Sequence, residues 1–343
     1  MNTLRLIGVL ACLILVVSVY STDAQAKKPP APPPSPSSGE AALGVFAGQD
    51  GGDGGAWESS TMTAVHQFEN LTGATSAATK PKMVHMFYPF YISNSCANLP
   101  PGPATAIREG YSPLLTLEFV NYNGGSTPAM TYANINNGTF DACWHAYAQQ
   151  MKGLQGNIYL RLFHEMNGDW YSWSVKGHEA EHIQAWRRIH DIFTSEGATN
   201  VKFVWCPNTR DFVDAGPYAN YYPGDSYVDY LGLDGYNWGS ANGSSWKSFD
   251  QIYSSSYKEI TSLPSSDPVM VGEYASHTAP GDKAQWITDA RNIIKSGTYP
   301  RLKELTYFNQ NADGASWQVD TTQASLDAYK AFVADPYYQS SMP

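Results

Sequence analysis

The chain has 343 residues, of which 43% are hydrophobic, and its formal net charge at pH 7 is −10. No cluster of Lys or Arg goes beyond the pair Lys27-Lys28, so nucleic acid and an anionic membrane are poor partner candidates. Aromatic residues reach 13%, and many stand beside Gly, Asn and Asp. Ring faces next to amides and acids suit a neutral polar ligand such as a sugar chain, although core packing is the commoner role for any single Tyr.

The first 26 residues have the three parts of a secretory signal peptide. Arg5 gives a positive start, residues 6–19 form an apolar core, and Ala24-Gln25-Ala26 is an A-x-A cleavage site. We therefore expect a secreted, extracellular and monomeric protein, with an uncleaved N-terminal anchor as the alternative. Residues 27–40, rich in Pro and Ser, predict an extended linker, and residues 41–343 predict one domain.

Three cysteines remain after the predicted signal peptide. Cys206 ends an apolar run and is expected to be a buried free thiol. Cys96 and Cys143 could form a disulfide in an oxidising compartment. Sequence gives no distance between their Cα atoms, so this pairing is a hypothesis.

Eight short apolar segments rich in β-forming residues follow one another, mostly without alternation, as is typical of buried parallel strands. They are residues 43–47, 83–88, 113–119, 157–163, 201–205, 230–234, 268–272 and 305–308. Helical patterns lie between several of them, notably at 179–196 and 282–296, each followed by Gly. This alternation predicts an α/β fold with a single (β/α)8 TIM barrel, and a doubly wound open sheet is the alternative.

Two of these segments run into a glutamate. Residues 157–163 lead to Glu165, and residues 268–272 lead directly to Glu273. Side chains at the C-terminal ends of barrel strands line the mouth of the barrel, so we expect the two carboxyl groups to meet there. Two carboxyl groups about 5 to 5.5 Å apart are the arrangement that cleaves a glycosidic bond with retention of configuration.

Arg161 lies on the strand that leads to Glu165. In an extended strand Arg161, Phe163 and Glu165 would share one face, so the guanidinium could lie below the acid pair and keep a carboxylate ionised and oriented. An ordinary ion pair in the barrel interior is the equal alternative for Arg161.

Glu118 also falls at a strand end and is the main competitor for a catalytic role, ahead of Asp234 and Asp211. A third carboxylate near two others commonly tunes a pKa or binds hydroxyl groups, so we assign Glu118 to substrate binding. His85 lies inside a predicted strand, where a core histidine is commoner than a ligand.

Residues 161–170 (Arg-Leu-Phe-His-Glu-Met-Asn-Gly-Asp-Trp) and, later in the chain, residues 271–274 (Val-Gly-Glu-Tyr) resemble the two signatures of glycoside hydrolase family 26. Weaker likeness extends over the presumed barrel, including residues 44–48 and 228–238. The resemblance implies a (β/α)8 retaining endo-β-glycanase that acts on a plant or algal wall polysaccharide. It also implies that Glu165 is the acid/base and Glu273 the nucleophile.

The resemblance implies binding roles as well. His164 would contact substrate at the cleavage site, Trp170 aligns with the family's binding tryptophan, and Tyr236 matches the tyrosine that hydrogen-bonds the nucleophile. Trp173 would be a further sugar platform, with loop packing as its alternative. Trp317 follows the eighth strand, where a platform under the scissile sugar is expected.

Other chemistries fit less well. A zinc-protease reading of His164-Glu165 fails because the second His at i+4 is missing. The sequence contains no G-x-S-x-G pentapeptide, Gly-rich phosphate loop, C-x-x-C or plausible metal cluster, so we expect no cofactor and no metal. An inactive barrel that binds glycans is the non-enzymatic alternative, but it would have little need of both strand-end glutamates.

The expected substrate is a β-glucan. Residues 118–124 lack the His-x-x-Asn-Pro element of the mannanase pattern, while residues 113–118 and 234–238 look more like the branch that acts on β-1,4- or mixed-linkage β-1,3-1,4-glucan. We therefore favour a lichenase or endoglucanase. An endo-β-1,4-mannanase is the alternative, and an endo-β-1,3-xylanase is less favoured.

Overall fold

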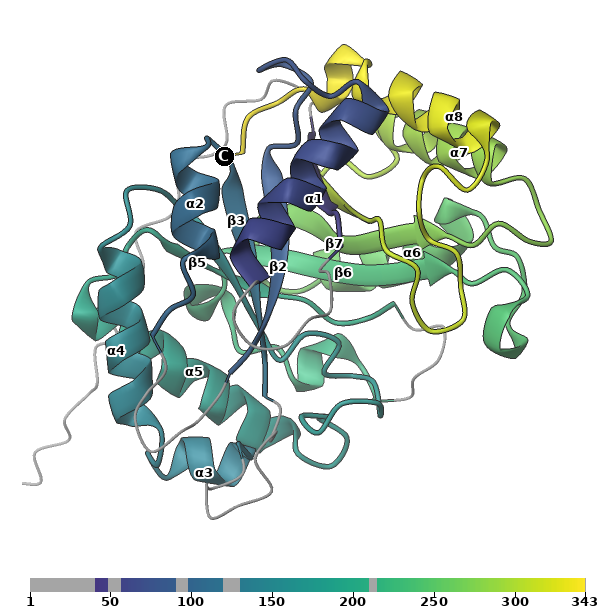
Figure 1. Ribbon diagram of the computed structural model, residues 1–343. Coiled ribbons are helices and arrows are strands. Elements are labelled where there is room, and N and C mark those ends of the chain that lie inside the picture. The colour runs from purple at the N-terminus through teal and green to yellow at the C-terminus, as the bar shows by residue number, and fades with distance from the viewer. Residues whose placement is uncertain (1–40, 49–56, 91–97, 120–129, 210–214, 343) are drawn as a thin grey trace, which may run out of the picture. The chain divides into compact units, whose positions relative to one another are not determined.

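Eight parallel strands close into a barrel in the order of the chain, each hydrogen-bonded to the next and β8 to β1 (Figure 1). The computed structural model describes residues 41–48, 57–90, 98–119, 130–209 and 215–342. The strands are β1 (Ala42–Phe46), β2 (Met83–Pro89), β3 (Ser112–Glu118), β4 (Ile158–Leu162), β5 (Val201–Trp205), β6 (Tyr230–Asn237), β7 (Val269–Ser276) and β8 (Leu302–Phe308). The predicted (β/α)8 barrel is confirmed, and the open sheet is excluded.

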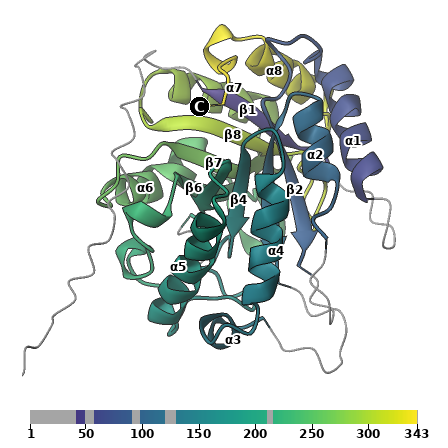
Figure 2. The same cartoon turned by 90° about the vertical axis from the view of Figure 1, so that its left-hand side faces the viewer.

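Helices cover the outside of the barrel, and α7 lies beside α8 in both views (Figures 1 and 2). They are α1 (Trp57–Thr72), α2 (Gly102–Arg108), α3 (Tyr132–Asn136), α4 (Asp141–Lys152), α5 (Glu179–Glu196), α6 (Phe249–Thr261), α7 (Lys283–Lys295) and α8 (Gln323–Val333). Within the described ranges, no helix has the length and apolarity to cross a membrane.

The two helices predicted from spacing form where expected. α5 turns Trp186, Ile189 and Phe193 towards the barrel and ends at Gly197, whose φ of 71° is left-handed. α7 begins after Asp282, whose side chain accepts a hydrogen bond from the Gln285 amide at 3.0 Å. The ends of both helices are therefore set by local sequence.

Strands β6 and β7 are longer than predicted. The predicted segments stop at Asp234 and Gly272, but the strands continue to Asn237 and Ser276. The extensions contain the polar residues Tyr236, Asn237, Glu273 and Ser276, so a loss of apolar character did not mark the end of either strand.

The barrel interior contains an apolar cluster and a set of buried polar groups. Its lower part is a cluster of buried side chains from six strands: Met83, Leu114, Tyr159, Val204, Cys206, Tyr230 and Met270. Above it lie buried polar groups, including His85, Thr116, Arg161 and Asp234, all of them without solvent exposure. Glu304 on β8 is also fully buried and lies in register with Met270 of this cluster, so the barrel interior holds a carboxyl group at this level as well.

The cysteines divide as follows. Cys206 is a buried free thiol, as predicted. Cys143 is disulfide-bonded, whereas Cys96 lies outside the described residues, so their pairing stays a prediction. The predicted signal peptide (1–26) and linker (27–40) also lie outside the described residues.

Gly232 lets β5 and β6 approach each other inside the barrel. A Cβ atom at this position would lie 2.5 Å from Cys206 Sγ and 3.0 Å from Cys206 Cα. We expect Gly232→Ala to lower the free energy of unfolding by about 1–3 kcal/mol, because the core has no room for the added methyl group. Urea unfolding measures the change.

Gly153→Ala is the matched control. Gly153 follows α4 with φ of −69°, and an added Cβ would have Gln150 O as its nearest neighbour at 3.3 Å. We expect no loss of stability there, since the substitution also restricts the unfolded chain. Equal losses for the two variants would contradict the packing argument.

Candidate active site

Glu165 lies in a strained turn immediately after β4. Phe163 and Glu165 have φ values of 48° and 52°, a region that residues with a Cβ seldom adopt. The Glu165 amide donates to the Cys206 carbonyl at 2.8 Å, and the Gly168 amide donates to the Glu165 carbonyl at 2.8 Å. These bonds tie the turn to the end of β5.

The turn corrects one sequence-based expectation. Phe163 does not share a face with Arg161 and Glu165, because its ring packs outside the barrel against His182 and Trp186, with centroids 5.4 and 6.4 Å away. The left-handed backbone at Phe163 breaks the alternation that an extended strand would have. Arg161 and Glu165 both reach the barrel interior.

Two side chains orient the Glu165 carboxyl group. Asn208 Nδ2 donates to Oε1 at 2.6 Å, and Trp170 Nε1 donates to Oε2 at 2.7 Å. Asn208 is itself fixed, because its amide donates to Asn167 Oδ1 and its carbonyl accepts from Asn167 Nδ2, both at 2.8 Å. Sequence reasoning missed Asn208, although it follows a buried strand just as Glu165 does.

Glu273, on β7, has hydrogen-bond donors at both oxygens. Arg161 Nη2 donates to Oε1 and Tyr236 OH donates to Oε2. The Glu273 side chain is 7% exposed. Both oxygens are thus held in place while the carboxylate stays at the barrel mouth.

Arg161 is fixed by a set of buried partners. Its Nη1 donates to Asp234 Oδ2 at 2.7 Å and its Nε donates to Thr116 Oγ1 at 2.7 Å. Burial alone would lower the pKa of the guanidinium, but the charges of Asp234 and Glu273 raise it above its ordinary value. Asp234, a weaker candidate in the sequence, is the carboxylate that anchors Arg161.

His85 lies beside Arg161 in the barrel interior. Arg161 Nη2 donates to His85 Nε2 at 3.0 Å, so this nitrogen is an acceptor and the imidazole is neutral. Burial, then the Arg161 charge, lowers the pKa of His85 well below its usual range. In the described part of the chain, no group of three or more His, Cys, Asp or Glu side chains could hold a metal ion.

Burial raises the pKa values of four carboxyl groups in the described part of the chain: Glu118, Glu165, Asp234 and Glu304. Burial raises the pKa of Glu165 to about 7, the Glu273 charge adds to this rise, and the hydrogen bonds from Asn208 and Trp170 oppose it. Burial and the Glu273 charge also raise the pKa of Glu118, at the end of β3. The site therefore combines a carboxylate paired with Arg161 and a carboxyl group that holds a proton near neutral pH.

His164 belongs to an aromatic wall beside the carboxyl groups. Its Nε2 is 2.9 Å from Tyr171 OH, and Tyr171 stacks on Trp173 with centroids 4.3 Å apart. Trp173 is 4% exposed, and its Nε1 donates to the His164 carbonyl at 2.8 Å. This burial favours the packing role for Trp173, which supports Tyr171 and His164. Sequence reasoning assigned no role to Tyr171.

The other two predicted platforms differ in exposure. Trp170 is 43% exposed, and its ring lies close against Gly168, where a Cβ would be 2.5 Å from the indole. Trp317 is 1% exposed and packs against Tyr236 and Trp238, with both centroids 4.9 Å away. The Trp170 ring is open to a ligand, whereas Trp317 backs the tyrosine that bonds Glu273.

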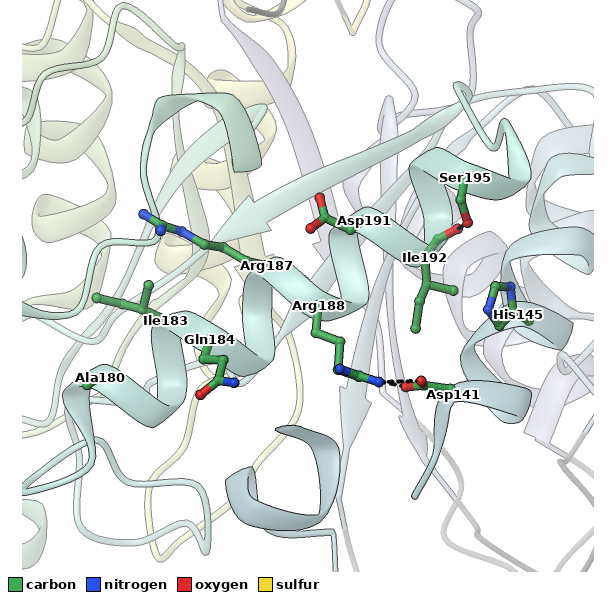
Figure 3. Close-up of a pocket in the computed structure, with 10 residues that line it drawn as sticks. All are labelled: Asp141, His145, Ala180, Ile183, Gln184, Arg187, Arg188, Asp191, Ile192 and Ser195. Carbon is green, nitrogen blue, oxygen red and sulfur yellow. Dashed lines mark hydrogen bonds and ion pairs between the residues drawn. The ribbon is translucent and has the colours of Figure 1, made fainter. Parts of the chain in front are cut away.

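A separate pocket of about 640 Å³ lies between α4 and α5 (Figure 3). It is lined by Asp141, His145, Ala180, Ile183, Gln184, Arg187, Arg188, Asp191, Ile192 and Ser195. None of the predicted site residues lines it, and its central Arg188–Asp141 ion pair already satisfies both partners. The paired carboxyl groups, and not this pocket, have the chemistry of an active site.

Known proteins resemble this chain in sequence and in fold. Residues 117–270 match the sequence profile described as Glycosyl hydrolase family 26. The chain is 35% identical over 286 residues to endoglucanase H of Acetivibrio thermocellus, which covers 80% of this chain and 30% of that protein. It is 35% identical over 102 residues to mannan endo-1,4-beta-mannosidase A and B of Caldalkalibacillus mannanilyticus, covering 26% of this chain and 19% of that protein.

The chain thus spans less than a third of the length of each of these two relatives. A modular endo-beta-1,4-mannanase from Cellulomonas fimi has the same fold, with a TM-score of 0.62 at 19% identity, over 88% of this chain and 72% of that one. The sequence profile covers the part of the barrel from the end of β3 to β7. The two relatives are named as an endoglucanase and a mannosidase. The chain belongs to glycosyl hydrolase family 26.

Proposed function

We propose that the protein is a secreted retaining endo-β-glycanase that hydrolyses a wall polysaccharide by double displacement. One observation carries the proposal: two glutamates at one barrel mouth have opposite surroundings. Glu273 is ion-paired with Arg161, while burial raises the pKa of Glu165 to about 7. A nucleophile must be ionised and a general acid must be protonated at the start of this reaction, and these surroundings favour those states.

In the first step, a Glu273 oxygen attacks the anomeric carbon while Glu165 gives its proton to the glycosidic oxygen. The bond to the leaving sugar breaks, and a covalent glycosyl ester forms on Glu273. In the second step, Glu165 takes a proton from water, whose oxygen attacks the same carbon and releases Glu273. Trp170 and Asn208 hold the Glu165 carboxyl group throughout.

We assign a β-1,4- or mixed-linkage β-1,3-1,4-glucan as substrate. The likeness to endoglucanase H extends over 80% of this chain, whereas the likeness to the Caldalkalibacillus mannosidase extends over 26%. The alternative is β-1,4-mannan, which the fold likeness to the Cellulomonas mannanase supports, followed by β-1,3-xylan and by an inactive glycan-binding barrel. Glu118 and His164 would bind sugar hydroxyl groups, and the pattern of residues 1–26 supports export.

Release of reducing ends from barley β-glucan, carboxymethyl cellulose, konjac glucomannan, galactomannan and β-1,3-xylan tests this assignment. We expect the highest kcat/KM on a glucan. A preference for galactomannan would show that mannan is the substrate. Failure to release reducing ends from any of these polysaccharides would favour the inactive glycan-binding barrel.

Removal of either glutamate should give a distinct product with azide. Glu273→Ala should lower kcat by on the order of a thousandfold or more, because the covalent step is lost. Azide would enter from the face that the carboxylate vacates, and the product would be an α-glycosyl azide. Product NMR measures its configuration.

Glu165→Ala is the matched variant. It should still form the ester from aryl glycosides with good leaving groups, because these need no general acid. Azide would then attack the ester and give the β-glycosyl azide. The same anomer from both variants, or unaffected turnover of Glu273→Ala, would refute the assigned roles.

The pH profile should report the proton on Glu165. We expect kcat/KM on polysaccharide to fall as pH rises above about 7, because the raised pKa of Glu165 keeps the acid protonated only below that value. Trp170→Phe keeps a ring but removes a donor that lowers this pKa. The alkaline limb should therefore move to higher pH, by up to about one unit.

Glu165→Ala, assayed on an activated aryl glycoside, is the control and should lack this limb. An alkaline limb that stays in place in Trp170→Phe, or that survives in Glu165→Ala, would assign the titration to another group.

A further inference from the structure

Lys283 is a buried lysine that the proposed reaction does not use. It is the first residue of α7 and is 2% exposed. Its Nζ donates to the Ser316 carbonyl at 3.0 Å and to the Gln318 carbonyl at 2.7 Å. Burial lowers the pKa of Lys283 to about 7, so the two carbonyl groups offset only part of the cost of burying its ammonium group.

The segment 316–318 is also hydrogen-bonded to side chains from two other parts of the fold. The Ser316 amide donates to Nδ1 of His277, which follows β7, at 3.0 Å. Tyr307 OH, on β8, donates to the Trp317 carbonyl at 2.8 Å. The backbone around Trp317 is therefore held by side chains from three places in the fold.

Contacts continue from Trp317 to the nucleophile. The Trp317 ring lies 4.9 Å from the Tyr236 ring, with 42° between their planes. Tyr236 OH donates to Glu273 Oε2. A shift of the loop would move the Trp317 ring, and the Tyr236 ring would lose the surface that keeps its hydroxyl aimed at Glu273.

We propose that Lys283 is a positioning residue for glycoside cleavage, which fixes the backbone on both sides of Trp317 and through it the contact of Tyr236 with Glu273. Lys283 does not touch the reacting atoms, so its effect depends on Trp317. The expected loss of kcat rests on the proposed function, whereas the effect of Lys283 on the backbone around Trp317 does not.

Lys283→Met tests the proposal, because methionine fills a similar volume and leaves both carbonyl groups without the Nζ donor. We expect kcat on an oligosaccharide to fall about tenfold with less than a threefold change in KM, since the nucleophile loses its orientation while most sugar contacts persist. Lys295→Met is the control. Lys295 lies at the other end of α7, is half exposed and bonds Asp335, so its variant should retain the parent kcat.

A double-mutant cycle separates positioning from general loss of stability. In a Trp317→Ala background, Lys283→Met should lower kcat by less than about twofold, because its effect passes through the missing ring. The same tenfold loss in both backgrounds would overturn the proposal.

Amide hydrogen exchange provides a readout that does not require activity. Lys283→Met should speed exchange at the Ser316, Gln318 and Val319 amides at least tenfold, while Lys295→Met leaves them unchanged. Unchanged exchange in a folded Lys283→Met protein would overturn the proposal. If Lys283→Met does not fold, Lys283→Gln, which is one bond shorter and cannot reach both carbonyl groups, is judged by the same outcomes.

The two hypotheses can fail separately. A parent protein without hydrolytic activity would refute the proposed function, and faster exchange in Lys283→Met would still support the positioning of the loop. An active parent with unaltered exchange and kcat in the variant would refute only the role of Lys283.

Discussion

The site depends on one buried guanidinium. Arg161 binds Asp234 and Glu273 with its terminal nitrogens, and neither it nor Asp234 is exposed to solvent. Loss of one member of such a set leaves an uncompensated buried charge, which typically destabilises a protein by about 3–5 kcal/mol. The interaction that orients Glu273 therefore also offsets part of the negative charge of the two buried carboxylates. Gly272 makes room for the pair of Arg161 and Asp234, since a Cβ at Gly272 would lie 2.7 Å from Asp234 Oδ1.

The two glutamates acquire unlike properties from their neighbours and not from their residue type. Glu273 faces a cation and a phenol, whereas the donors to the Glu165 carboxyl group among the described residues are the neutral side chains of Asn208 and Trp170. Neutral donors orient a carboxyl group without offsetting the full cost of burying its charge, so the proton is retained on Glu165. The barrel supplies this difference because each carboxyl group comes from a separate strand.

Much of the fold, and the meeting of Glu165 and Glu273, was predictable because strand ends in a barrel converge. The rule placed Glu165 and Glu273 correctly at the mouth, and the repeat of apolar segments indicated the barrel. Sequence could not reveal Asn208 or Lys283, since their roles depend on Asn167 and on the 316–318 backbone, which only the folded loops bring near. The burial of Trp317 was equally hidden, because loop packing and not local sequence decides it.

The left-handed backbone at Glu165 has a thermodynamic consequence. A residue with a side chain carries a cost of about 1 kcal/mol or more in that region, whereas glycine carries almost none. A chain with glycine in place of Glu165 would lose the proposed proton donor but would remove the backbone strain at this turn. Selection for catalysis therefore favours glutamate at position 165, whereas selection for stability favours glycine. Without selection for catalysis, a more stable but inactive barrel could replace this one.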